Sequence, residues 1–247
     1  MFGEHFYHKQ IRNTVIAFGT IFNNIHIKRL DSSGNPLQSL KVPLSYSPKE
    51  KFIARLDQQA SLTGTDSSVA ITLPRMAFDI GGYSYDPTRK LNKNQKRGVV
   101  TTNADTTKLN TQYSPVPYDV SFELNVFTAN SDDGLQIIEQ ILPYFQPDYT
   151  VTMIENSVMD SKRDIPFILE SVNYEDSYTG DLTATRRITY TLAFTAKIYL
   201  YGPISTGAVI KTVSADLYDN TADGGPSRSE RVTVTPNPTS ADKDDTY

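Results

Sequence analysis

One stretch, residues 135–147, constrains the fold of this chain more than any other segment. Its apolar residues recur at intervals of three and four, which is the spacing of one helix face: Leu135, Ile138, Ile141, Leu142 and Phe145. Ser131 can cap the start of this helix, and Asp132 and Asp133 lie where the helix dipole favours negative charge. Pro143 should kink or end the last turn and Pro147 should stop it, because proline has no backbone N–H to donate. The pattern predicts an amphipathic helix that packs against a larger element.

Strand signals dominate the remainder of residues 1–203. Residues 118–126 alternate apolar and polar side chains, which is typical of a half-buried strand. Helices are expected at 7–25 and at 47–59, the second with Ser47 as its N-cap. Further strands are expected at 25–30, 37–44, 69–73, 76–85, 149–155, 165–174 and 186–201. The first two should form a hairpin, and the last two should pair around a turn at 178–181. We therefore predict an α+β fold, a mostly antiparallel β-sheet flanked by helices.

Two segments have a different composition. Large apolar residues almost vanish from residues 86–112, where Asn, Thr and Lys dominate, and this predicts a long polar loop that is mobile when the protein is alone. Residues 204–247 are rich in Thr, Ser, Asp, Pro and Gly, and are expected to form a C-terminal extension, an arm or a disordered tail. This extension carries −3 of the formal net charge of −4. A nearly neutral body is not typical of a dedicated nucleic-acid binder.

The sequence gives little support to catalysis or to a cofactor. There are no cysteines and only three histidines, and neither a Gly-x-Ser-x-Gly nor a complete Gly-rich phosphate motif is present. We expect no enzyme activity, no metal and no cofactor. The rival hypothesis, a hydrolase that uses carboxylates, requires a deep pocket lined by acids with shifted pKa values. No signal peptide or membrane span is visible, so we expect a soluble protein made in the cytoplasm.

A run of cations stands in the polar segment. Five basic residues occur without an acidic one between them: Arg89, Lys90, Lys93, Lys96 and Arg97. A solvated loop explains such a run, and so does an arm that meets an acidic partner or a DNA backbone. Sequence-specific reading of DNA is not expected, because no basic fold or interleaved aromatic residues accompany the cations.

Several short motifs, in this order along the chain, carry a family resemblance. They are 1–3 (MFG), 24–29 (NIHIKR), 42–43 (VP) with Tyr46, 49–50 (KE), 73–75 (LPR), 112–115 (QYSP) with Pro117, 127–128 (FT), 136–147 (QIIEQILPYFQP), 162–165 (KRDI) and 186–187 (RR). With them the chain resembles the tail-completion and sheath-stabiliser family, the tail terminators of contractile-tailed bacteriophages. Residues 89–111 and those after 203 depart from the family pattern.

The resemblance implies a tail-terminator-like domain over residues 1–203 and a structural role in the virion. Members form a six-fold ring on the head-proximal end of the tail, at the junction with the neck, after assembly in the host cytoplasm. The implied partners are other copies of the chain, the tail sheath protein, the tail tube or a tube-terminator protein, and neck or head-completion proteins. DNA would pass through the pore without specific binding. The alternative is another ring-forming tail or connector component that contacts DNA non-specifically.

Candidate contact residues follow from the same segments. We expect the helix to offer contacts to neighbouring subunits or partners through Gln136, Glu139, Gln140, Tyr144 and Phe145. The basic pairs Lys28 with Arg29 and Arg186 with Arg187 are further candidates, together with the cations of residues 89–97.

Overall fold

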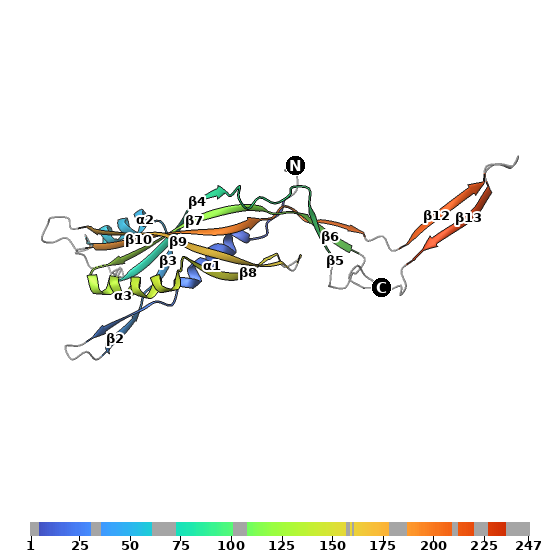
Figure 1. The fold of residues 1–247 in the computed structure, drawn as a ribbon. Coiled ribbons are helices and arrows are strands. Elements are labelled where there is room, and N and C mark those ends of the chain that lie inside the picture. The colour runs from blue at the N-terminus through green and yellow to red at the C-terminus, as the bar shows by residue number, and fades with distance from the viewer. Residues whose placement is uncertain are drawn as a thin grey trace. The chain divides into compact units, whose positions relative to one another are not determined.

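The computed structural model describes residues 5–30, 36–60, 73–100, 108–156, 159, 161–177, 187–208, 212–219 and 227–235. The chain divides into two compact units (Figure 1). The first unit takes residues 1–92 and 115–201, and the second takes residues 93–114 and 202–247. The domain expected over residues 1–203 differs from this division, because residues 93–114 group with the C-terminal segment.

A six-stranded sheet in the order β3-β4-β7-β10-β9-β8 forms the centre of the first unit. Its strands are β3 (Leu44–Tyr46), β4 (Arg75–Tyr85), β7 (Val116–Thr128), β8 (Asp148–Asn156), β9 (Ser161–Ser177) and β10 (Arg187–Leu200). Only the short β3–β4 pair is parallel; every other pair in the sheet is antiparallel. The predicted antiparallel sheet is confirmed, and so is the pairing of the two long strands β9 and β10.

Helix α1 (Gln10–Phe22) covers one face of this sheet. The ring of Phe18 is fully buried and stacks on Phe122 of β7, with 4.5 Å between the ring centroids. The same ring contacts Phe78, Phe167 and Phe194 from three further strands. The apolar side chains of alternate strand positions therefore meet α1 in one core, as the alternation predicts.

Helix α2 (Lys49–Ala60) lies on the opposite face of the sheet. Phe52 stacks on Phe127, with 4.5 Å between the ring centroids, and Ala77 completes this smaller cluster. Phe127 and its neighbour Val126, which belongs to the main core, point to opposite faces because side chains alternate along a strand.

Helix α3 (Ser131–Ile141) and the short 3₁₀ helix η1 (Leu142–Tyr144) are the segment that the sequence singled out. Ile137, Ile138 and Ile141 are buried, and the α-helix ends two residues before Pro143. The predicted cap is wrong: Asn130 is the N-cap residue, without a side-chain capping bond, and Ser131 is already helical. Leu135, placed on the apolar face by its spacing, is 56% exposed.

The prediction of a loop over residues 86–112 is wrong where two strands form. Strands β5 (Lys96–Val100) and β6 (Lys108–Tyr113) pair with each other, and β11 (Ser205–Ala208) joins β6. Polar contacts hold this sheet: Gln112 Nε2 donates to the carbonyl of Gly202, at 2.8 Å, and Thr206 donates to Asn110. Buried amides replace the apolar alternation that marks an ordinary strand, so the pattern gave no strand signal.

Two hairpins complete the fold. β1 (His26–Leu30) and β2 (Pro36–Lys41) pair in the first unit, as predicted, and β12 (Val213–Asp219) and β13 (Ser227–Val234) pair in the C-terminal extension. The expected turn at 178–181 and nearly all of the expected strand at 69–73 lie outside the described residues. The expected first helix begins at Gln10, and Tyr7 before it is exposed. No helix in the described part of the chain is long and apolar enough to cross a membrane.

A candidate interaction site on helix α3

A glutamine on the polar side of α3 forms hydrogen bonds with the edge of β1 that does not pair with β2. Gln136 Oε1 accepts the backbone N–H of Lys28 at 3.0 Å, and Gln136 Nε2 donates to the carbonyl of Lys28 at 3.1 Å. A primary amide presents one acceptor and two donors, so it can bond a strand edge as another strand would. Nε2 also lies 2.8 Å from Asp132 Oδ2, which fixes the amide orientation.

A second glutamine continues this contact one helical turn further along. Gln140 Nε2 donates to the carbonyl of His26 at 2.8 Å and to the carbonyl of Gln136 at 2.9 Å. Arg29 adds an ion pair with the buried Asp133, at 3.3 Å. The structure thus brings three residues of β1 (His26, Lys28 and Arg29) to three residues of α3 (Asp133, Gln136 and Gln140) that lie more than a hundred positions away in sequence, which spacing alone could not reveal. These contacts satisfy the edge of β1, which would otherwise present unpaired backbone groups.

Close packing of α3 on the sheet depends on Gly134. A Cβ atom built at this position would lie 2.6 Å from Tyr190 of β10 and 3.2 Å from Thr128 Oγ1. Because Gly134 has no side chain, α3 can approach the sheet closely. This close approach sets the position from which Gln136 and Gln140 reach β1.

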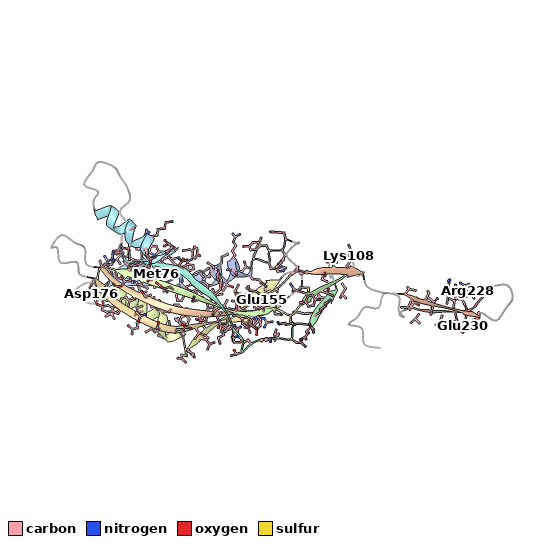
Figure 2. All side chains as sticks on the ribbon, turned by 90° about the horizontal axis from the view of Figure 1, so that it is seen from above. Met76, Lys108, Glu155, Asp176, Arg228 and Glu230 are labelled. Atoms are coloured by element: carbon pink, nitrogen blue, oxygen red, sulfur yellow. The ribbon has the colours of Figure 1, made fainter. Side chains whose placement is uncertain are left out.

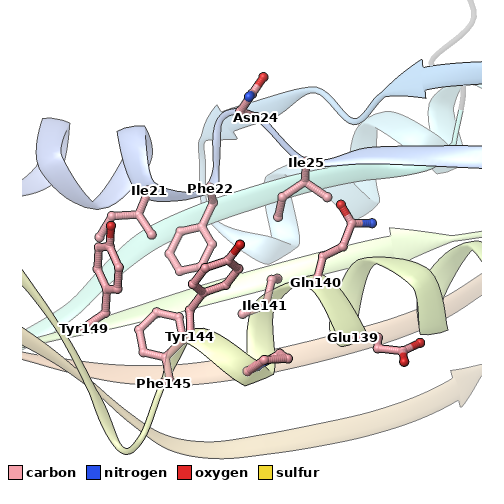
Figure 3. A pocket seen from close by; sticks show the side chains of 11 residues that line it. Ile21, Phe22, Asn24, Ile25, Glu139, Gln140, Ile141, Tyr144, Phe145 and Tyr149 are labelled. Atoms are coloured by element: carbon pink, nitrogen blue, oxygen red, sulfur yellow. The ribbon is translucent and has the colours of Figure 1, made fainter.

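An open groove of about 550 Å³ lies beside the C-terminal end of α3 (Figure 3). The residues that line it come from the end of α1, the connection from α1 to β1, α3, η1 and the segment from η1 into β8: Ile21, Phe22, Asn24, Ile25, Glu139, Gln140, Ile141, Pro143, Tyr144, Phe145 and Tyr149. Phe145 is buried, with its ring 5.1 Å from Phe194 and 6.0 Å from Phe22, so it contributes to the core beneath the groove. Tyr144 is 69% exposed and Glu139 is exposed, so these two remain open to a partner. Asn24 was not expected at this groove, because it lies more than a hundred residues from α3 in sequence. Tyr149 follows η1 by five residues and was not among the expected contact residues.

The cations of residues 89–97 do not form one group. Arg89 is held inside the first unit: its Nε donates to Asp86 Oδ2 and its Nη2 to Asp119 Oδ1, both at 2.6 Å. The Arg89 guanidinium, with Thr88, holds the pKa of Asp86 well below its ordinary value. Lys96 lies over the ring of Tyr113, 4.7 Å from its centroid, on the β5–β6 sheet of the second unit. Lys90, Lys93 and Arg97 are exposed.

The remaining predicted contact residues are the pair at 186–187. Arg187 begins β10 opposite Ser177 and is half-buried, whereas Arg186 lies outside the described residues. Whether this pair contacts a partner stays a prediction.

The arrangement is suited to binding rather than to chemistry. Glu139 is the one carboxylate among the groove-lining residues, and no group of three His, Asp or Glu side chains suited to a metal occurs among the described residues. Open grooves rimmed by a tyrosine and lined by apolar side chains are typical of protein–protein contacts. The groove therefore has the character of an interaction surface, typical of the class of proteins that act through contacts with other proteins.

Comparison with known proteins identifies the family. Residues 5–247 match the model of the T4-like virus Myoviridae tail sheath stabiliser, and the chain belongs to this family. The chain is 35% identical over 232 residues to the tail completion protein gp15 of Enterobacteria phage T4, covering 90% of this chain and 82% of that protein. The protein is therefore a structural component of a bacteriophage tail and not an enzyme, and the resemblance in the sequence motifs is confirmed.

Proposed function

We propose that this protein caps the head-proximal end of a contractile tail as a ring of six identical subunits. The family match over residues 5–247, to tail sheath stabilisers, is the observation that carries the proposal. The ring binds the last discs of tube and sheath, offers no surface for another sheath disc, and presents its other face to the neck. It thereby ends growth and holds the sheath extended, while DNA passes through the pore without specific binding.

A ring of identical chains requires two different, mutually complementary side surfaces on each subunit. We assign the groove beside α3 to one of them, with Tyr144 and Glu139 as the contact residues. Exposed tyrosine gives a large contact area with a polar tip, which supports this assignment. Gln136, Gln140, Lys28 and Arg29 support the contact from within the subunit, because their described bonds are internal. Phe145 supports the contact through its packing in the core beneath the groove.

The cations of the second unit suit an acidic partner. Lys93, Lys96 and Arg97 are exposed within a protein whose formal net charge is −4. An overall negative charge disfavours the capture of DNA, whereas a local group of cations attracts an acidic protein surface at short range. We assign these three residues to contacts with the sheath, the tube or the neck.

Electron microscopy of the purified protein, with and without tails, tests the proposal. We expect six-fold rings at the head-proximal end of tails. Tyr144→Ala should weaken ring formation, whereas Leu135→Ala should not, because Leu135 is exposed on the adjoining helix α3 but does not line the groove. A protein that stays monomeric and never joins tails would contradict the capping function, and equal effects of the two substitutions would contradict the groove assignment.

The alternative is a connector that grips DNA, and the exposed Lys96–Tyr113 stack is the observation that favours it. Binding of duplex DNA by the isolated protein, falling steeply as salt is raised, would support this alternative. Capping predicts no such binding at physiological salt.

A further inference from the structure

A continuous set of polar contacts lies within the first unit, close to the three points where the chain leaves or re-enters that unit. The chain leaves the first unit after residue 92, returns to it at residue 115 and leaves it again after residue 201. Arg89, close to the first crossing, bonds Asp119 and the carbonyl of Tyr118, close to the second. Its guanidinium lies 5.1 Å from the ring centroid of Tyr199, close to the third. One side chain therefore contacts segments beside all three crossings.

A second arginine, Arg163, contacts the same ring and extends the set. The guanidinium of Arg163 lies 4.2 Å from the centroid of Tyr199. Arg163 Nε donates to Glu155 Oε2 at 3.2 Å, and Arg163 Nη2 donates to the hydroxyl of Tyr201 at 3.2 Å. The Tyr201 hydroxyl donates in turn to Glu155 Oε2 at 2.6 Å. Burial and the Glu155 carboxylate raise the pKa of Tyr201, so its hydroxyl keeps the proton that it donates.

Helix α1 completes the set through Gln10. Gln10 Oε1 accepts the backbone N–H of Tyr201 at 3.1 Å. Only the oxygen of an amide can accept this bond, so the contact fixes which end of the side chain faces Tyr201. The Nε2 group of Gln10 must therefore point elsewhere.

Two buried atoms of this set lack a protein partner. Gln10 Nε2 and Glu155 Oε1 make no hydrogen bond to any described residue, although Glu155 is only 6% exposed. A buried polar group without a hydrogen-bond partner destabilises the fold, and a charged group does so more strongly. Both residues line one small cavity of about 10 Å³, together with the polar residues Asn13, Thr14 and Tyr199 and the apolar residues Met153, Ile154, Ile165 and Ile198. A cavity of roughly 10–15 Å³ can hold one water molecule where polar groups line it, as Gln10 and Glu155 do here.

We propose that this cavity is the site of one structural water molecule, which accepts a hydrogen bond from Gln10 Nε2 and donates one to Glu155 Oε1. The donor–acceptor pair selects this ligand. A metal cation would face the N–H groups of Gln10 and the nearby Arg163, and an anion would face the Glu155 carboxylate. The water joins the start of α1 to the end of β8 and closes the contacts around Tyr201. The proposal does not depend on the capping function.

A high-resolution structure of the full chain tests the site. We expect density for one water at about 2.7–3.2 Å from both atoms. In the ¹⁵N-labelled protein, the side-chain amide of Gln10 should show a nuclear Overhauser effect to a long-lived water. A direct contact between Gln10 and Glu155, or an empty cavity in well-ordered density, would overturn the proposal.

Gln10→Met provides the matched variant, because methionine keeps the length of the side chain without the amide. We expect the water density to disappear and the Tyr201 amide to exchange faster with solvent, while the amide of Ile188, at the other end of the preceding strand β10, is unchanged. Gln38→Met, at an exposed glutamine in β2, should change neither the density nor the exchange. Water density that persists at full occupancy in Gln10→Met would show that Gln10 is not a ligand. The wild-type density decides the question on its own if the variant does not fold.

Discussion

The two hairpins of this protein have the same local structure and opposite surroundings. In β1–β2, Ile27 is fully buried, and Ile25, just before β1, is 8% exposed, because both side chains enter the main core. In β12–β13, the apolar side chains of one face are open to solvent, with Val213 56%, Leu217 52% and Val234 62% exposed. Figure 2 marks Arg228 and Glu230 on the second hairpin. Antiparallel pairing alone does not decide whether a hairpin is part of a core.

The two hairpins differ in the contacts that stabilise them. The outer edge of β1 is bonded by two neutral amides from α3, and its apolar face lies on the sheet core. β12–β13 is held across its strands by charge: Arg231 donates twice to Asp216, at 2.6 and 2.8 Å. An isolated two-stranded hairpin is only marginally stable in water. The first hairpin therefore shares the stability of the unit, and the second depends on its own cross-strand pairs.

The largest expected effect separates the hairpins by burial. Ile27→Ala should lower the free energy of unfolding by about 2–5 kcal/mol, because it opens a cavity in the core. Val232→Ala, at a 43% exposed position of β13, should change it by less than about 0.5 kcal/mol. Chemical denaturation of the isolated protein measures both values. Equal losses would show that the second hairpin is packed as well as the first.

Gly134→Ala tests the close packing of α3, the helix that bonds β1, against the sheet. Alanine favours helices, yet here its Cβ would clash with Tyr190, so we expect a loss of about 1–3 kcal/mol. Gly207→Ala is the control, because nothing lies within 4 Å of the added atom. A stabilised Gly134→Ala variant would show that α3 can move away from the sheet without cost.

A smaller effect is expected from the glutamine contact itself. Gln136→Ala removes two bonds to Lys28, and water can replace them at this exposed edge, so the loss should be about 1 kcal/mol. The amide of Lys28 should exchange faster with solvent, and hydrogen exchange followed by NMR measures this. Glu139→Ala, on the same helix, should leave that amide unchanged. An unchanged Lys28 amide in Gln136→Ala would mean that the contact does not hold β1.

The smallest effect near neutral pH concerns the charge that holds β12–β13. The Arg231 hydrogen bond lowers the pKa of Asp216, so this contribution to stability is complete above the unfolded pKa of about 3.9 and is lost as pH falls toward the folded value. Amide shifts of β12–β13 should therefore change on acidification below about pH 4, and Asp216→Asn should abolish this response. High salt at neutral pH should loosen β12–β13 more than β1–β2, because the amide contacts of β1 are not screened and its Arg29–Asp133 ion pair has a buried carboxylate. An equal response of the two hairpins to salt would contradict this distinction.

The sequence predictions that succeeded best concern elements whose buried residues recur at a regular spacing along the chain. The 3.6-residue spacing of residues 135–147 predicted α3, and the alternation of residues 118–126 predicted β7, because each pattern records which side of one element faces the core. The misses have the same physical basis. β5 and β6 carry polar side chains, so no alternation marked them, and Leu135 has the spacing of a core residue but lies on the exposed side.

The sequence by itself determined the family, the antiparallel α+β fold and the helix with its proline stop, since local spacing and short motifs are sufficient for these. Only the tertiary structure decided what the polar residues do. It joined Gln136 and Gln140 to β1 across more than a hundred residues, and it placed Arg89 inside the first unit rather than on a mobile loop. The reason is that a hydrogen bond between distant segments depends on where the packed core places their backbones, and no local pattern records that position.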